Sequence, residues 1–118
     1  EMAQGADVDI LVNVGSIDLL PHALEWAALG VLPQGMYRNR HFAESEVVAD
    51  GIAQATQDLL FCPETSGGLM IAVAHDDADA LVADLLADGR VPSARIVGEV
   101  VPHLGGPRIT LRGERGLS

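Results

Sequence analysis

The 118-residue chain is poor in aromatic residues, cysteine and basic residues, and each shortage excludes a class of protein. Aromatic residues make up only 3%, so any core must be built from Leu, Val, Ile and Ala. The single cysteine, Cys62, excludes an internal disulfide and is typical of a reducing compartment. No apolar run approaches the roughly 18 residues that cross a bilayer, and no basic leader precedes one. We therefore expect a cytoplasmic protein with no membrane partner.

The charge balance excludes a second class of partner. Seventeen acidic residues against seven basic ones give a formal net charge of −10. Duplex binding needs clustered Lys and Arg to neutralise phosphates, so nucleic acid is not the expected partner. One cysteine and four scattered histidines also lack the spacing of zinc ligands, and we predict no metal site. The histidines are His22, His41, His75 and His103.

The chain predicts one domain that belongs to a longer protein. Apolar residues make up 48% and charged residues 20%, which is typical of a globular domain of this length. The first residues, "EMAQG", resemble the last turn of a helix that Gly5 ends, with no room for its beginning. We expect a single carboxy-terminal domain over residues 1–112 of a longer enzyme, and a loose tail over 113–118.

Hydrophobic periodicity predicts alternating strands and helices, which favours an α/β or α+β fold with helices packed on a mixed sheet. Gly30 and Gly89 are placed to end the two clearest helices in left-handed conformations. Gly98 lies within a predicted strand, where glycine marks a bulge or a close backbone approach. The expected order is a strand at Val8–Val14, a helix from Pro21, a loop over 31–42, a weaker helix entered by Asp50, a strand at Leu69–Ala74, a helix after Asp76–Asp77, and strands at 94–101 and 108–112.

The segment "TSGG", residues 65–68, is the first candidate site. Its hydroxyls and glycine amides are groups that can bind an anion. A Walker loop would require a Lys and a following helix, and neither is present. A nucleophile elbow would require Gly where Glu64 stands. Spacing alone therefore favours a structural turn that leads into a buried strand.

The segment "MYRNR", residues 36–40, is the second candidate. Arg38 and Arg40 lie two residues apart in an acidic chain, so they could face a substrate phosphate or an acidic partner. The alternative is that both neutralise acidic groups of the domain's own surface, because exposed ion pairs are frequent and weak.

Two further features favour ordinary structural roles. The acidic residues between Asp76 and Asp88 lie at a helix N-terminus and along its exposed face, where negative charge is favourable without any ion. Cys62 has no cation or helix N-terminus beside it in sequence, so we interpret it as a half-buried, unreactive thiol.

Together these motifs resemble the carboxy-terminal domain of the selenophosphate synthetases (selenide, water dikinases). The likeness extends from Glu1 to about Pro102, and it depends on the combination of an Arg-Asn pair with Thr-Ser-Gly-Gly. Many family members have Asp where this chain has Cys62. The matching residues are Leu20, Pro21, Ala23, Ala28, Gly30, Pro33, Gly35, Arg38, Asn39, Pro63, Thr65, Ser66, Gly67, Gly68 and Leu69.

The resemblance implies the fold of the aminoimidazole ribonucleotide synthetase superfamily, whose second domain is a mixed sheet flanked by helices and partly ferredoxin-like. It also implies a homodimeric parent enzyme that converts ATP, selenide and water to selenophosphate, AMP and phosphate with Mg²⁺. The family's reactive and magnesium-binding residues lie in an amino-terminal ATP-binding half that is missing here. We therefore expect this chain alone to bind no cofactor, to hold no catalytic residue and to be inactive.

The candidate phosphate or inter-domain contacts that the resemblance implies are Arg38, Asn39, Thr65, Ser66, Gly67 and Gly68. Two alternatives stay open at this point. The chain could be a stand-alone binding or scaffolding module of the same fold. It could also belong to a related ATP-dependent enzyme of the superfamily that resembles thiamine-phosphate kinase.

Overall fold

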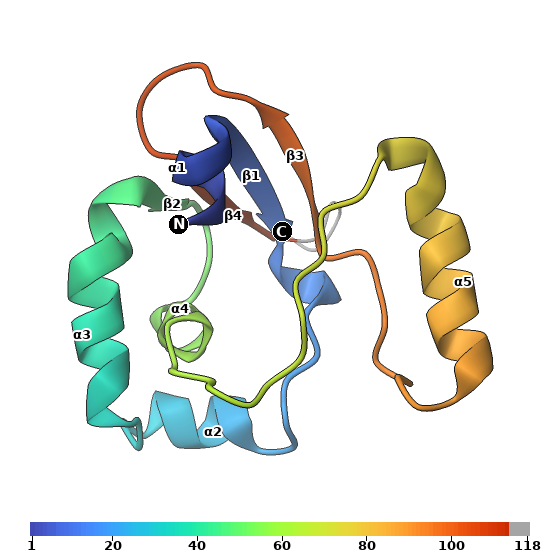
Figure 1. The fold of residues 1–118 in the computed structure, drawn as a ribbon. Coiled ribbons are helices and arrows are strands. Elements are labelled where there is room, and N and C mark those ends of the chain that lie inside the picture. The colour runs from blue at the N-terminus through green and yellow to red at the C-terminus, as the bar shows by residue number, and fades with distance from the viewer. Residues whose placement is uncertain (114–118) are drawn as a thin grey trace.

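A computed structural model describes residues 1–113 as a mixed four-stranded sheet with helices beside it (Figure 1). The predicted α+β class is confirmed. No helix in this part of the chain is long and apolar enough to span a membrane. The strands are β1 (Val8–Asn13), β2 (Val47–Ala49), β3 (Gly98–Pro102) and β4 (Ile109–Arg112), and the helices are α1 (Met2–Ala6), α2 (Ala23–Ala28), α3 (Gln34–Ala43), α4 (Gln54–Leu60) and α5 (Ala78–Asp88), with 3₁₀ turns η1 (Val14–Ser16), η2 (Glu44–Glu46) and η3 (His75–Asp77).

The first strand of the chain lies inside the sheet, whose order is β2-β4-β1-β3. Ile10 is opposite Val100 of antiparallel β3 and opposite Ile109 of parallel β4. On the other side of β4, β2 pairs in parallel and places Val47 opposite Ile109. Strands β2 and β3 therefore form the two edges.

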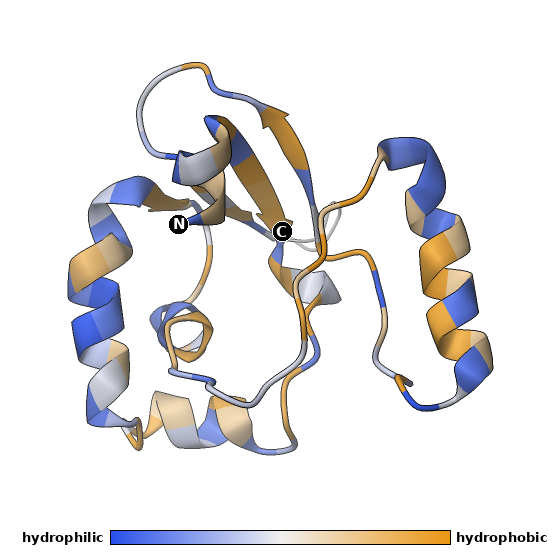
Figure 2. Ribbon diagram, viewed as in Figure 1, coloured by the Kyte–Doolittle hydropathy of each residue, from blue (hydrophilic) through white to orange (hydrophobic). Residues whose placement is uncertain are grey.

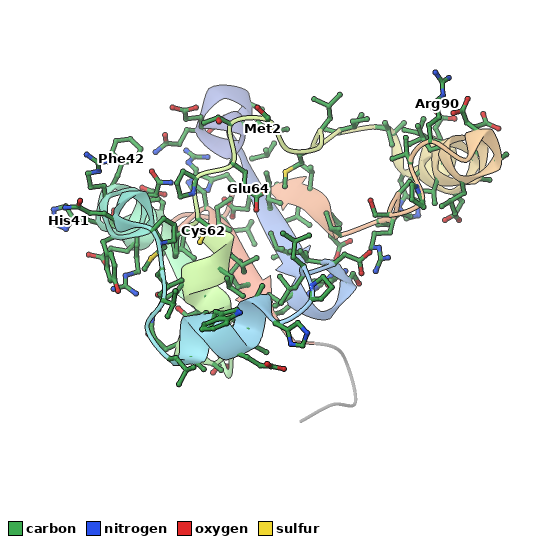
Figure 3. All side chains as sticks on the ribbon, turned by 90° about the horizontal axis from the view of Figure 1, so that it is seen from below. Met2, His41, Phe42, Cys62, Glu64 and Arg90 are labelled. Carbon is green, nitrogen blue, oxygen red and sulfur yellow. The ribbon has the colours of Figure 1, made fainter. Side chains whose placement is uncertain are left out.

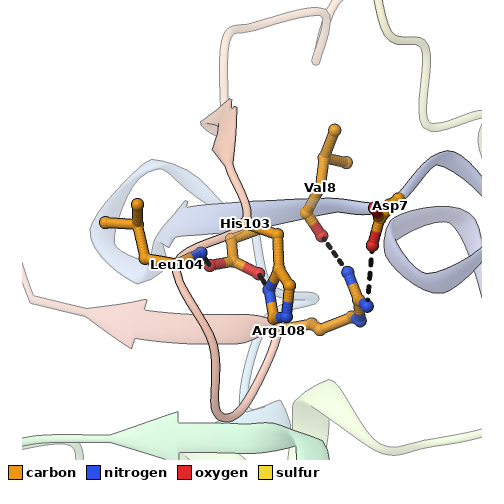
Figure 4. A network of polar contacts seen from close by, with 6 residues as sticks. Asp7, Val8, His103, Leu104 and Arg108 are labelled. Carbon is orange, nitrogen blue, oxygen red and sulfur yellow. Dashed lines mark hydrogen bonds and ion pairs between the residues drawn. The ribbon is translucent and has the colours of Figure 1, made fainter.

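A polar cluster joins the start of β1 to the loop between β3 and β4 (Figure 4). The Nδ1 atom of His103 lies 2.7 Å from Oδ1 of Asp9, and the backbone N–H of Leu104 donates to Oδ2 of Asp9 at 3.4 Å. Arg108 donates to the carboxylate of Asp7 at 3.0 Å and to the carbonyl of Val8 at 3.3 Å. The hydrogen bond from His103 lowers the pKa of Asp9.

The close approach predicted at Gly98 is confirmed. A Cβ at this position would overlap the carbonyl oxygen of Leu11 and would lie 3.2 Å from Cα of Val12. Only glycine lets β1 and β3 meet at this point.

The predicted end of the first helix is wrong by two residues. Helix α1 continues through Gly5 to Ala6, and Asp7 adopts the left-handed conformation with φ 55°. The N–H of Asp7 bonds to the carbonyls of Ala3 and Gln4. Asp is one of the few non-glycine residues that adopt this conformation readily, because its short polar side chain can bond locally.

The predicted loop over 31–42 is also wrong, because most of it forms α3. Pro33 precedes the first helical residue, with φ −68° and ψ 144°, and so begins the helix. Proline is tolerated at a helix start, where its missing N–H would have no intrahelical partner. Met36 on α3 is fully buried. The burial of this side chain stabilises the helix by more than the glycine in its first turn destabilises it.

Helix α2 begins later than predicted and ends as predicted. His22 is left-handed with φ 65°, so the helix starts at Ala23 and leaves Pro21 outside it. Gly30 has φ 79° and lies just beyond the end. The weaker predicted helix forms as α4, but it begins at Gln54, after the left-handed Gly51, rather than at Asp50.

The predicted buried strand at Leu69–Ala74 is not formed. This segment is extended, exposed and unpaired with any strand of residues 1–113. The apolar run satisfies the sequence pattern of a buried strand, but no neighbouring strand or layer covers it. The helix after it is confirmed as α5, and Gly89 ends it with φ 77°. The last two strands are confirmed, but the first of them begins only at Gly98. Apart from Gly113, the predicted tail lies outside the described residues.

Candidate functional site

The three polar residues in the middle of α3 have different surroundings. Arg38 is exposed and makes no hydrogen bond or ion pair within residues 1–113. Asn39 donates from its side-chain amide to the carbonyl of Phe61 at 2.9 Å. Arg40 forms an ion pair with Asp58 on α4. The interpretation that both arginines neutralise the domain's own surface therefore fits Arg40 and does not fit Arg38.

The Arg40–Asp58 pair fixes α3 against α4. Asp58 is only 7% exposed, and Gln54 donates to its Oδ1 atom at 2.8 Å. Arg40 also lies over the ring of Tyr37, with 5.5 Å between the guanidinium carbon and the ring centroid. A charge buried this far must be paired and hydrogen-bonded, and here it is. Sequence reasoning missed this pair, although the four-residue spacing of Gln54 and Asp58 was a usable signal.

Helix α3 also holds the chain just before the Thr-Ser-Gly-Gly segment. A Cβ on Gly35 would lie 3.0 Å from Cγ of Pro63, so the glycine allows a close approach. The Asn39–Phe61 hydrogen bond lies two residues earlier in that chain. The structure therefore joins the Arg-Asn motif to Phe61, 22 residues after Asn39, in the segment that leads into Thr65–Gly68.

Thr65 and Ser66 lie at an exposed bend, and Gly67 and Gly68 continue it as extended, exposed backbone. Neither hydroxyl has a hydrogen-bond partner in the part of the chain that the structure describes. Neither glycine has a left-handed conformation. A Cβ on Gly67 would lie 3.1 Å from a carboxylate oxygen of Glu64, whereas one on Gly68 would meet open space. The predicted structural turn is thus an open bend next to the carboxylate of Glu64, which Figure 3 labels, and no strand follows it.

Cys62 lies between the two motifs and has the surroundings of an unreactive thiol. Its side chain is half-buried, and its sulfur lies 3.6 Å from the carbonyl oxygen of Asp58. Burial raises the pKa of the Cys62 thiol, and the nearby charges of Glu64 and Asp58 raise it further. A raised pKa disfavours the thiolate, which is the nucleophilic form.

The described residues do not offer a magnesium site. Within residues 1–113, no three side chains of His, Cys, Asp or Glu are placed to hold a metal ion. Of the acidic residues near α5, Asp88 is paired with Arg90, and the hydrogen bond from Arg90 lowers the pKa of Asp88.

Two shallow pockets border α4. One, of about 440 Å³, lies between α3, β2 and α4 and is lined by both members of the Arg40–Asp58 pair. The other, of about 360 Å³, lies where the parallel strands β1, β2 and β4 end. Its lining residues are Val14, Gly15, Gly51, Ile52, Ala53, Thr56 and Gly113.

The fold and both motifs define a known class of domain. Residues 1–107 match the family model of the AIR synthase related protein, C-terminal domain, and the chain belongs to this family. It is similar to proteins named selenide, water dikinase. It is 40% identical over 103 residues to the one from Clostridioides difficile, and 42% identical over 102 residues to the one from Pelobacter propionicus. The predicted resemblance is confirmed.

These relatives are much longer than the present chain. Each of the two alignments covers 86% of this chain and 29% of the relative. A third selenide, water dikinase, from Nitratidesulfovibrio vulgaris, is 38% identical over 114 residues, which are 95% of this chain and 32% of that protein. The chain thus spans about three tenths of the length of the curated relatives it matches.

Proposed function

We propose that this chain is the carboxy-terminal domain of an ATP-dependent selenide, water dikinase. The parent reaction would convert ATP, selenide and water to selenophosphate, AMP and phosphate. The names of the similar proteins support this activity over one like that of thiamine-phosphate kinase. The length of those relatives leaves room for a separate ATP-binding domain, which we propose as the partner of this one and as the source of the magnesium ligands.

Within that enzyme, we propose that α3 and residues 65–68 form one face toward the nucleotide phosphates or the partner domain. The observation that supports this most directly is the hydrogen bond from Asn39 to Phe61, because it joins the two family motifs physically. Exposed hydroxyls on Thr65 and Ser66 and the exposed cation of Arg38 are groups that bind phosphate oxygens. These groups bind and orient; none is a nucleophile or a base.

The carboxylate of Glu64 sets a limit on this proposal. It lies next to Gly67, and an unneutralised carboxylate repels a phosphate. A phosphate approaching residues 65–68 would therefore gain from the cation of Arg38 and lose from Glu64. For this reason we propose that the chain alone binds nucleotide weakly, where the resemblance implied no binding. We expect it to release no AMP, because the proposed ATP-binding domain is absent from it.

An amide-resolved NMR titration tests the proposed face. Pyrophosphate and then Mg-ATP are added to the 118-residue chain, and shifts are expected at residues 65–68 and near Arg38. Glu64→Gln should strengthen the pyrophosphate response by about 2- to 5-fold, because it removes a nearby negative charge. Asp88→Asn, at the far end of α5, is the matched control and should leave the response unchanged. A folded chain with no shifts at residues 65–68 would exclude phosphate binding by this segment.

The full-length enzyme provides the test of activity. Thr65→Ala combined with Ser66→Ala should lower the rate of AMP formation by about 10-fold if both hydroxyls contact phosphate in the transition state. Unchanged turnover would return these residues to a purely structural role. Release of AMP from ATP and selenide by the 118-residue chain alone would contradict the proposed division of labour.

A further inference from the structure

The tripeptide Ala-Asp-Gly occurs twice in the chain, at residues 49–51 and 87–89, and no other aspartate precedes a glycine. An aspartate before glycine can react with its own backbone, because glycine has no side chain to hinder attack of its amide nitrogen on the neighbouring carboxyl group. The two copies share the reacting residues and the residue before them. Their structural surroundings therefore decide which copy reacts.

Access to solvent does not distinguish the two copies. Asp50 and Asp88 are both exposed. Gly51 has φ 68° and Gly89 has φ 77°, and a Cβ on either glycine would meet no atom within 4 Å. Figure 2 shows that the chain is hydrophilic where α5 ends, which is where the second copy lies. Water and the reacting groups can therefore reach both copies.

The second copy is held by hydrogen bonds that oppose the reaction. The N–H of Gly89 donates to the carbonyl of Leu86 at 3.2 Å. Arg90 forms an ion pair with Asp88, and one guanidinium nitrogen lies 2.9 Å from Oδ2 of that carboxylate. The hydrogen bond from Arg90 lowers the pKa of Asp88, which leaves less of the neutral acid whose hydroxyl group can leave. Reaction at this copy must break both contacts.

The first copy has neither contact. Asp50 and Gly51 form a bend between β2 and α4, outside any helix or strand. Within residues 1–113, the carboxylate of Asp50 makes no ion pair or hydrogen bond, and the N–H of Gly51 has no acceptor. The reacting groups of this copy can therefore turn toward each other without the loss of a protein contact.

We propose that Asp50 isomerises spontaneously to isoaspartate in the folded chain and that Asp88 is protected. The amide nitrogen of Gly51 attacks the side-chain carboxyl carbon of Asp50, and the carboxyl hydroxyl leaves with the amide proton as water. The product is a closed succinimide ring. Water then adds to the former backbone carbonyl and breaks its bond to the Gly51 nitrogen, so the chain continues through the side-chain carboxyl group. The water lost is regained, and no oxidant or cofactor takes part.

Isomerisation changes the joint between β2 and α4. Isoaspartate adds a methylene group to the main-chain path and places a new carboxylate beside it. Ala49, just before the joint, is opposite Leu111 of β4, and β2 pairs with no other strand of residues 1–113. A strand of three residues at a sheet edge has few hydrogen bonds to hold it, so we expect the longer joint to release β2. This inference does not depend on the proposed activity.

Incubation of the 118-residue chain in warm neutral buffer is the first test. Endoproteinase Asp-N cleaves before aspartate and not before isoaspartate, so cleavage before residue 50 should be lost while cleavage before residue 88 remains. The loss at Asp50 should be about 10-fold faster, because one hydrogen bond and one ion pair protect Asp88. Equal rates at the two positions, or no loss at either, would overturn the proposal.

Unfolding provides the control for effects of sequence. In urea, both contacts of Asp88 are lost, and the two tripeptides should isomerise at similar rates. A preference for Asp50 that persisted in urea would show that the fold does not select the site, and the proposed protection of Asp88 would be wrong.

Two matched variants identify the reacting residue. Asp50→Glu keeps the charge but must close a larger ring, which forms much more slowly. Isoaspartate is counted as the labelled methyl groups that an isoaspartyl carboxyl methyltransferase transfers from S-adenosylmethionine. The count should fall to background in Asp50→Glu and stay unchanged in Asp88→Glu. An unchanged count in Asp50→Glu would overturn the assignment.

Hydrogen exchange tests the effect on the sheet. Chains that carry isoaspartate are separated by chromatography and compared with unmodified chains. Amides 47–49 should lose protection in the modified chains, whereas amides 8–13 of β1 should keep theirs, because β1 is paired on both sides. Equal protection of amides 47–49 in both forms would contradict the release of β2.

Discussion

Asn39 and Phe61 are joined by a 2.9 Å hydrogen bond from the side-chain amide of one to the backbone carbonyl of the other. The bond spans 22 residues of sequence and connects the middle of α3 to the end of α4. It also fixes the chain four residues before Thr65. Two motifs that are separate in the sequence therefore act mechanically as one unit.

Replacing Asn39 with Ala is expected to lower the free energy of unfolding by about 1 kcal/mol, because a neutral hydrogen bond contributes about that much. Amides 62–68 should exchange faster with solvent, since the anchor of that segment is lost. Urea unfolding and hydrogen exchange measure the two effects. Arg38→Ala, one residue away and exposed, is the control and should change stability by less than about 0.5 kcal/mol. Equal effects of both variants would refute the anchoring role.

Replacing Arg40 with Ala should cost about 2 kcal/mol, because it leaves the nearly buried carboxylate of Asp58 with only Gln54 as partner. Arg40→Lys should cost less, since it keeps the charge and loses the fork geometry. The measurement is a double-mutant cycle with Asp58→Asn in urea. A coupling energy near zero between positions 40 and 58 would show that the pair does not hold α3 to α4.

Replacing Gly98 with Ala should destabilise the chain by about 3 kcal/mol or prevent folding, because the added methyl group would overlap the backbone of β1. The neighbour is backbone and cannot rotate away. Gly68→Ala is the matched control: its Cβ would meet open space and its φ is not left-handed. Thermal unfolding followed by circular dichroism compares the two. A Gly98→Ala protein as stable as Gly68→Ala would mean that β1 and β3 are not paired as described.

Asp9 should contribute to the acid sensitivity of the fold. Its pKa is lowered in the folded chain by the hydrogen bond from His103, so its stabilising effect is present above the unfolded-state value of about 4. The effect is lost as pH falls through the lower, folded pKa. Asp9→Asn should therefore be less stable than wild type at pH 7, and the difference should shrink below pH 4. Urea midpoints at pH 7 and pH 3 test this, and a difference that grows in acid would contradict it.

Local sequence signals correctly predicted those elements in which the hydrophobic pattern and the residues at the boundaries indicate the same structure. The alternation of Val8, Ile10 and Val12 gave β1, and the stripe of α5 ends at Gly89 as expected. The same signals failed at Pro33, where one residue type both breaks and begins helices. The burial of Met36 decides between these outcomes, and burial is a tertiary property that spacing does not contain.

The candidate site was predictable in part. Sequence resemblance selected Arg38, Asn39 and Thr65–Gly68, but it could not assign different partners to neighbouring side chains. The division between an exposed Arg38 and a paired Arg40 depends on where Asp58 lies on the next helix. The prediction of a buried strand at Leu69–Ala74 was wrong, because a strand needs a neighbouring edge to pair with, and an apolar run in the sequence does not contain that edge.

The position of β1 has a consequence for how the chain is made. Of the four strands of this sheet, β1 is synthesised first, and both of its partners lie roughly 90–100 residues later, in β3 and β4. At about 5–20 residues per second, β1 waits on the order of 5–20 s for them. Contacts of such long range also slow folding once synthesis ends. During that interval the apolar face of β1 is unprotected, so a nascent chain that stalls before residue 98 should be a substrate for chaperones.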